Sequence, residues 1–192
     1  MTGEVLLIDN FDSFTFNLME SIQRLGRKVR VVRNRIDPDW AIEFARKQRA
    51  PIVISPGPGT PREAGACLDI IAKAKGEVPL VGICLGHQAI VEEAGGAVTQ
   101  APVPVHGKAS ILHHDGLGPF AGAETPLRIG RYHSLCTRDV PARFHVHGEI
   151  DGMAMAISDP DAMQVGLQFH PESILTPGGD EVLRNVLDRW IY

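Results

Sequence analysis

The chain has 192 residues, of which 44% are hydrophobic and 22% are charged, so it suits a globular domain with a sizeable core. The formal net charge of -4, with Lys and Arg scattered along the chain, argues against nucleic acid or an anionic membrane as a partner. The apolar run before Asp9 is too short for a signal peptide or a membrane anchor. The three cysteines are an odd number without tight spacing, which argues against a disulfide framework. We therefore expect a cytoplasmic protein with reduced thiols.

Short apolar strands alternate with helical stretches through the first half of the chain. We expect the first helix to be capped by Asp12 or Ser13 and to end at Gly26. The alternation predicts a parallel sheet with helices on both faces. The predicted strands span 4–9, 28–34, 51–55 and 78–84, and the predicted helices span 13–26, 40–48, a part of 63–75, and 86–95.

From about residue 96 the strands are less regularly separated by helices, and a last helix is expected within 180–191. We expect this half to form an antiparallel or mixed extension of the same sheet. No internal repeat, low-complexity segment or long linker divides the chain. The sequence therefore predicts an α/β fold with one domain over 1–192, built on an open, mostly parallel sheet.

The stretch "GICLG", residues 82–86, has the glycine spacing of a nucleophile elbow, a sharp turn from a strand into a helix. Cys84 would then lie at the amino end of the helix, where the helix dipole lowers a thiol pKa and favours the thiolate. The backbone N–H of Leu85 would point toward a developing oxyanion. These five residues fit a buried core cysteine at a glycine-rich turn equally well.

A thiolate in acyl chemistry needs a base that is itself held in place. His170 has a carboxylate two residues along, in Glu172, and the alternation of apolar residues around it places both on one strand face. Pro171 biases His170 toward an extended conformation. His87, although nearer to Cys84 in sequence, is expected to point away around the helix. We therefore expect His170 to be the base and Glu172 to orient it.

The loop "SPGPGTP", residues 55–61, directly follows a predicted strand. Taken alone, it is simply a rigid turn. Loops at the carboxyl ends of adjacent parallel strands gather at one crevice, however, and the turn at Cys84 leaves the same edge of the sheet. The N–H of Gly57 could then be a second oxyanion donor opposite that of Leu85.

Histidines at other positions raise the alternative of a metal site. These are the "HHD" of residues 113–115 and the pair His145 and His147. Neither an HExxH nor a paired CxxC motif accompanies them, so we expect exposed loop and strand residues and no metal. The nucleotide-binding patterns also fail, because Arg62 stands where a GxGxxG motif needs glycine and "PVHGKA" lacks the first glycine and the Ser or Thr of a P-loop. No cofactor is expected for this chain.

The pair "GICLGHQ" and "QFHPES" resembles the signatures of the class I (triad) glutamine amidotransferases, and the resemblance covers essentially the whole chain. Within that class, "LIDNFDSFTFN", "ISPGPGTPREAG", "HGKAS" and "RYHSL" are similar to the anthranilate synthase component II and aminodeoxychorismate synthase component II subfamily. The resemblance implies the flavodoxin-like fold of the class, a Cys84 nucleophile, His170 as base and acid, and Glu172 as the orienting carboxylate. It also implies that glutamine is held by Gly57, Pro58, Gly59, Leu85, Gln88, Ser134 and Leu135.

The resemblance further implies a partner, a larger chorismate-using synthase subunit that binds Mg²⁺ and forms a hetero-oligomer with this chain. The tryptophan branch is expected first, with the folate branch, or one chain shared by both, as the alternative. "DNFDSF" and "HGKAS" are candidates for the docking face, although Asp12 and Ser13 are equally explained as helix caps and Lys108 as a solvated charge. A stand-alone cysteine hydrolase and a regulatory subunit with an idle triad remain as further hypotheses.

Overall fold

Seven strands form the central sheet of the computed structural model, which describes residues 3–189; the ends of the predicted domain and of the last predicted helix, at 1–2 and 190–192, lie outside the described residues. The first five strands in the order run parallel, and the last two pair antiparallel, which confirms the mostly parallel sheet with an antiparallel extension. In spatial order the strands are β2 (Lys28–Arg33), β1 (Glu4–Asp9), β3 (Ile52–Ile54), β4 (Leu80–Ile83), β11 (Gln164–Leu167), β10 (Met153–Asp159) and β9 (His145–Ile150).

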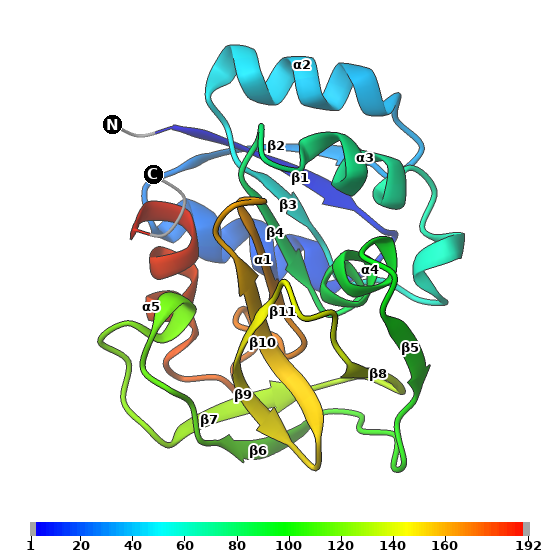
Figure 1. Cartoon of the computed structure of the whole chain (residues 1–192). Coiled ribbons are helices and arrows are strands. Elements are labelled where there is room, and N and C mark those ends of the chain that lie inside the picture. The colour runs from blue at the N-terminus through cyan, green and yellow to red at the C-terminus, as the bar shows by residue number, and fades with distance from the viewer. Residues whose placement is uncertain (1–2, 190–192) are drawn as a thin grey trace.

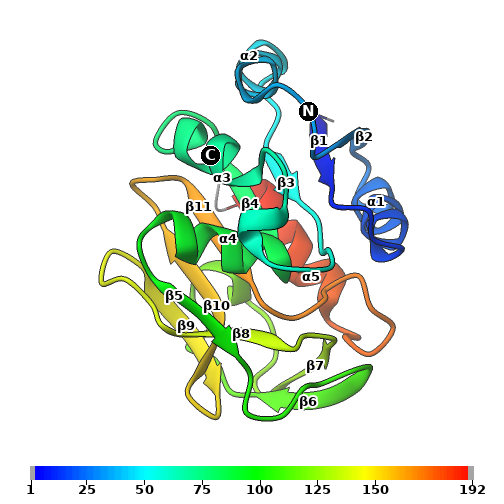
Figure 2. The ribbon, with the colours of Figure 1, turned by 90° about the vertical axis from the view of Figure 1, so that its right-hand side faces the viewer.

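Helices cover both faces of this sheet, as the alternating pattern predicts (Figures 1 and 2). On one face pack α1 (Phe14–Arg24) and α5 (Gly179–Arg184), which continues into a π-helical turn, Asn185–Arg189. On the other face pack α2 (Pro38–Gln48), α3 (Cys67–Ala74) and α4 (Leu85–Glu93). Leu18 and Ile22, one turn apart on α1, are both fully buried, so a single apolar stripe fixes that helix to the sheet.

The start of α1 is held by one of the two residues expected to cap it. Asp12 Oδ1 accepts a hydrogen bond from Phe14 N at 2.7 Å, whereas Ser13 makes no side-chain cap bond. Gly26 follows the helix with φ of 82°, a left-handed conformation that suits glycine. None of the helices within residues 3–189 is long and apolar enough to cross a membrane.

Four strands of the second half form two separate two-stranded ribbons beside the main sheet (Figures 1 and 2). One ribbon pairs β5 (Ala97–Gln100) with β8 (Leu135–Asp139), and the other pairs β6 (Lys108–Leu112) with β7 (Leu127–Arg131). The sequence predicted strands here without separating them from the sheet. β5 has no fully buried residue and β6 has one, so neither carries the continuous apolar run of a central strand.

Candidate active site

Cys84 stands at the turn between β4 and α4 in a strained backbone conformation, with φ of 52° and ψ of -98°. The flanking glycines are sterically required. A Cβ at Gly82 would lie 2.3 Å from the backbone of Gly86, and one at Gly86 would lie 2.6 Å from Ile54 O. Because Cys84 N also donates to Leu167 O at 2.7 Å, the turn is fixed between β11 and α4. The local geometry is therefore that of the elbow that the glycine spacing predicted.

His170 and Glu172 form a buried pair just beyond the end of β11. His170 Nδ1 lies 2.7 Å from Glu172 Oε1, and the two side chains are 3% and 0% exposed. The main chain of His170 is fixed at both ends, since its N donates to Gly130 O at 3.0 Å and its carbonyl accepts from Thr176 Oγ1 at 2.7 Å. The carboxylate therefore holds Nδ1 and leaves Nε2, which has no hydrogen-bond partner among the described residues, as the reactive nitrogen.

The electrostatics of the pair favour a charged imidazole. Burial by itself lowers the pKa of His170, but the negative charge of Glu172 and the interaction with the Cys84 sulfur outweigh it and raise that pKa to about 10. The His170 imidazole can therefore carry a proton at neutral pH and act as an acid.

Two aromatic rings that sequence reasoning missed hold the imidazole from its sides. Phe14, from α1, and Tyr132, from the "RYHSL" segment, each meet the His170 ring at a centroid distance of 4.9 Å with steep interplanar angles, and they contact each other at 4.8 Å. The Tyr132 hydroxyl lies 2.9 Å from Ser173 Oγ. Both rings belong to motifs that resemble the subfamily, but nothing in an isolated sequence distinguishes them from ordinary core aromatics.

A third residue outside the predicted site is Gln168, whose side chain is fully buried beside the cysteine. Its Nε2 lies 3.7 Å from Cys84 Sγ, and its Oε1 accepts from Gln88 Nε2 at 3.1 Å. Gln88 Nε2 also donates to Leu135 O at 3.1 Å. This chain of amides links the cysteine to the start of β8, and it places two residues of the predicted glutamine site, Gln88 and Leu135, in direct contact.

Asn10, the residue after β1, holds the loop after β3. Asn10 N donates to Ser55 Oγ and Asn10 Nδ2 donates to Ser55 O, both at 2.9 Å. A Cβ at Gly57 would lie 2.5 Å from the Cβ of Asn10 and 2.7 Å from Cδ2 of Leu85, so only glycine lets the loop approach this closely. The structure thus brings Gly57 beside Leu85, the two residues predicted to supply oxyanion donors. Asn10 belongs to "DNFDSF" and has at least this structural role.

The remaining residues of the predicted glutamine site lie around the same edge. Pro58 lines a cavity of about 160 Å³ together with Leu85 and Asn10. Gly59 has φ of 78°, which favours glycine at this position. Ser134 is exposed, and its carbonyl accepts from Ala101 N at 2.8 Å.

The other histidines near the sheet differ sharply from His170. His87 Nε2 lies 2.8 Å from Thr137 Oγ1, and burial lowers the pKa of His87 to about 3, so it is a neutral core side chain. The expectation that it points away from the nucleophile agrees with this contact. The expectation that His145 and His147 are both exposed is wrong for His147, which is 4% exposed because Ser158 and the Phe120 ring cover it.

The sequence of this chain is similar to those of known proteins. The family model described as "Glutamine amidotransferase class-I" matches residues 6–190. The anthranilate synthase component 2 of Buchnera aphidicola subsp. Schizaphis graminum is 45% identical over 187 residues, which cover 97% of this chain and 95% of that protein. A protein of Pseudomonas aeruginosa named "Anthranilate synthase component 2, pyocyanine specific" is 46% identical over 184 residues, which cover 95% of this chain and 92% of that protein.

Solved structures agree at the level of the fold. A putative GMP synthase chain from Thermoplasma acidophilum superposes with a TM-score of 0.85 at 21% identity, covering 97% of this chain and 93% of that one. A glutamine amidotransferase from Thermotoga maritima gives a TM-score of 0.77 at 17% identity, covering 100% and 99%. The arrangement of strands and helices is therefore common to chains whose sequences have diverged widely.

Proposed function

Because the chain belongs to the class-I glutamine amidotransferase family, we propose that it is the glutaminase subunit of an anthranilate synthase, releasing ammonia from L-glutamine for a larger chorismate-using subunit. The observation that carries the proposal is the convergence of Cys84, in its strained elbow, with the buried His170–Glu172 pair at the carboxyl ends of β4 and β11. The names of the relatives at 45% and 46% identity support the anthranilate branch over the folate branch.

In the first half-reaction the Cys84 thiolate attacks the side-chain amide carbon of glutamine. The carbonyl electrons move onto oxygen, where the N–H groups of Gly57 and Leu85 are the candidate donors; such a donor commonly contributes about 3 kcal/mol to transition-state stabilisation. His170 gives its Nε2 proton to the amide nitrogen, the C–N bond breaks, and ammonia departs. A glutamyl thioester on Cys84 and a neutral imidazole remain.

In the second half-reaction His170 takes a proton from water, and the water oxygen attacks the thioester carbon. The C–S bond breaks, so the thiolate and the imidazolium are restored and glutamate leaves after its new carboxyl group releases a proton to solvent. Glu172 forms and breaks no covalent bond in either half-reaction. Its carboxylate accepts a hydrogen bond from His170 Nδ1 and stabilises the positive charge of the ring.

The need for a partner follows from the chemistry of the product. Ammonia is mostly protonated at neutral pH and is then a poor nucleophile, so it is used best when it passes directly to an acceptor site sheltered from water. A second active site for a chorismate-like acceptor is therefore assigned to the larger subunit, which also holds the Mg²⁺ of the reaction.

Glutamate release from L-glutamine, measured for this chain alone and with the chorismate-using subunit, tests the proposal. We expect activity that requires the partner, or rises strongly with it, and anthranilate as the product of the complex. Full activity of the isolated chain would favour a stand-alone cysteine hydrolase, and absence of activity in both samples would favour a regulatory subunit with an idle triad. Aminodeoxychorismate as the product would place the chain in the folate branch.

A further inference from the structure

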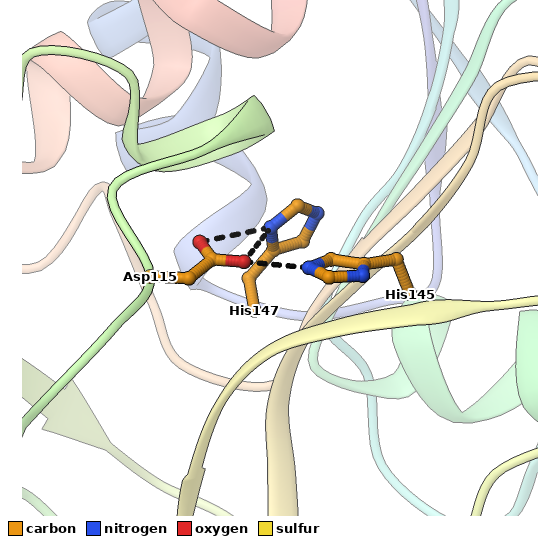
Figure 3. Close-up of side chains that lie close together, drawn as sticks. All are labelled: Asp115, His145 and His147. Atoms are coloured by element: carbon orange, nitrogen blue, oxygen red, sulfur yellow. Dashed lines mark hydrogen bonds and ion pairs between the residues drawn. The ribbon is translucent and has the colours of Figure 1, made fainter.

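The three side chains of Asp115, His145 and His147 form a compact cluster (Figure 3), and the two histidines belong to β9 at the edge of the sheet. Their ligand atoms all lie within 4.8 Å of one another. Asp115 Oδ2 is 2.6 Å from His145 Nε2 and 3.1 Å from His147 Nδ1. Two nitrogens and one oxygen bound to Zn²⁺ at the usual lengths would be roughly 3.3 Å apart in tetrahedral geometry. The distance of 3.1 Å between Asp115 Oδ2 and His147 Nδ1 is close to this value, and the other ligand pairs would shift to reach it.

Main-chain contacts hold the donors in place without any metal. Asp115 N donates to His147 O at 3.0 Å, and the preceding residue, His114, forms an antiparallel bridge with Gly148. A Cβ at Gly148 would lie 2.9 Å from His113 O, so glycine permits this close approach. The loop after β6 and the strand β9 are therefore already joined at the level of the backbone, and their side chains meet in a prearranged geometry.

The outer contacts of the cluster are those that metal-binding side chains usually make. His147 Nε2 lies 2.7 Å from Ser158 Oγ, which can accept its proton and leave Nδ1 with a free lone pair toward Asp115. Asp115 Oδ1 accepts from Leu117 N at 2.9 Å, which fixes the carboxylate and leaves Oδ2 directed at both rings.

The site is also open on one side. An open depression of about 520 Å³ lies beside it, lined by residues 113–115 and 146–149, and the side chain of His145 is 55% exposed. An ion can therefore enter from solvent, and water can complete its coordination shell.

We infer that Asp115, His145 and His147 bind one divalent transition-metal ion of the Zn²⁺ type, which ties the loop after β6 to the edge strand β9. Two imidazoles with one carboxylate are a donor set that suits Zn²⁺, whereas Mg²⁺ and Ca²⁺ prefer sites made of oxygen alone. The sheet order places two strands, β11 and β10, between β4 with its cysteine and β9 with the two histidines, so this site is separate from the candidate active site.

Titration of the protein with Zn²⁺ tests the inference, and the Cys84→Ser chain is the right background because a thiolate beside His170 could itself hold Zn²⁺. We expect one equivalent to bind in calorimetry and a rise in Tm of about 5 °C or more at a hundredfold excess over Kd. Substituted Co²⁺ should show ligand-field bands without the thiolate-to-cobalt charge-transfer band.

His145→Ala and Asp115→Asn should each weaken binding at least tenfold and remove the rise in Tm, whereas the matched control His106→Ala, at an exposed histidine of the loop before β6, should bind as the parent does. The Tm of each variant without metal shows whether it is folded. If the Cys84→Ser chain does not bind Zn²⁺, then either the parent chain binds the ion through the Cys84 thiolate or the protein has no Zn²⁺ site. If His145→Ala and Asp115→Asn bind Zn²⁺ as tightly as the parent does, then the ion binds elsewhere and the cluster is held by hydrogen bonds alone. Either result overturns the inference, and neither bears on the glutaminase.

Discussion

Glu172 is the first of the neighbours that raise the pKa of His170. Burial lowers its pKa and Glu172 raises it, so the neutral variant Glu172→Gln should let burial dominate and bring the pKa of His170 down from about 10 toward or below its ordinary value of 6.5. The imidazole would then be neutral at pH 7, and kcat should fall roughly 100-fold because the leaving ammonia lacks its proton donor. Titration of the His170 ring by NMR measures the shift directly.

Glu172→Gln should also change how the free energy of unfolding depends on pH. Since the pKa of His170 in the folded protein lies above the ordinary 6.5, its protonation favours the folded state; this contribution is complete below about pH 6.5 and is lost as the pH rises through about 10. The difference in free energy of unfolding between the parent chain and Glu172→Gln should therefore narrow between pH 7 and pH 10. A difference that stayed constant over this range would contradict the assignment of the charge to His170.

Gln168 is expected to affect the reaction by positioning Cys84, and a substitution tests this role. Its Nε2 faces Cys84 Sγ at 3.7 Å, so Gln168→Met should lower kcat for glutamine about tenfold while KM changes little. Gln164→Met is the matched control, because Gln164, on β11, is as buried as Gln168. Its side chain does not contact the cysteine; it accepts a hydrogen bond from Arg143 Nη2 and donates one to Ile71 O. Both variants should lose stability. An equal loss of kcat in the control would show that Gln168 has only a structural role.

At the scale of elements, the turn from β4 into α4 is the most constrained part of the site. A Cβ at Gly82 would lie 2.3 Å from backbone atoms that cannot move without displacing α4, so Gly82→Ala should destabilise the fold by about 2 kcal/mol and abolish glutaminase activity. Urea denaturation checks the first effect. Gly3→Ala, whose added Cβ would meet only Arg27 Nη1 at 3.5 Å, is the control and should leave both properties unchanged.

The elements that could be predicted from sequence are those with a strong local signal. β1 spans the residues that its apolar run predicted, and α2 differs from its prediction by two residues at its start. The elbow was predictable because sterics demand glycines on either side of Cys84. The contact between His170 and Glu172 was predictable from their spacing of two residues, but the strand face expected for them was wrong, because β11 ends at Leu167 and both residues lie in the turn beyond it. Pairing of the later strands was not predictable, because β5 and β6 are short and mostly exposed and their partners come from tertiary packing.

At the scale of the whole molecule, one rule accounts for the part of the site that sequence identified. The carboxyl ends of parallel strands meet at one edge, so Cys84 after β4 and His170 after β11 come together although 86 positions separate them in sequence. No such rule brings the Phe14 and Tyr132 rings to His170, or Asp115 to His145 and His147. Those contacts depend on where a helix and a ribbon pack, and only the fold reveals them.

The central claim is that Cys84 supplies ammonia from glutamine to a separate synthase subunit. Formation of product by the complex should be measured with glutamine and with ammonium salt as alternative nitrogen sources, for the parent chain and for Cys84→Ser. We predict that Cys84→Ser abolishes the glutamine-dependent rate and preserves the ammonia-dependent rate, because the larger synthase chain and its contact with this one remain intact. Retention of the glutamine-dependent rate in Cys84→Ser would contradict the account.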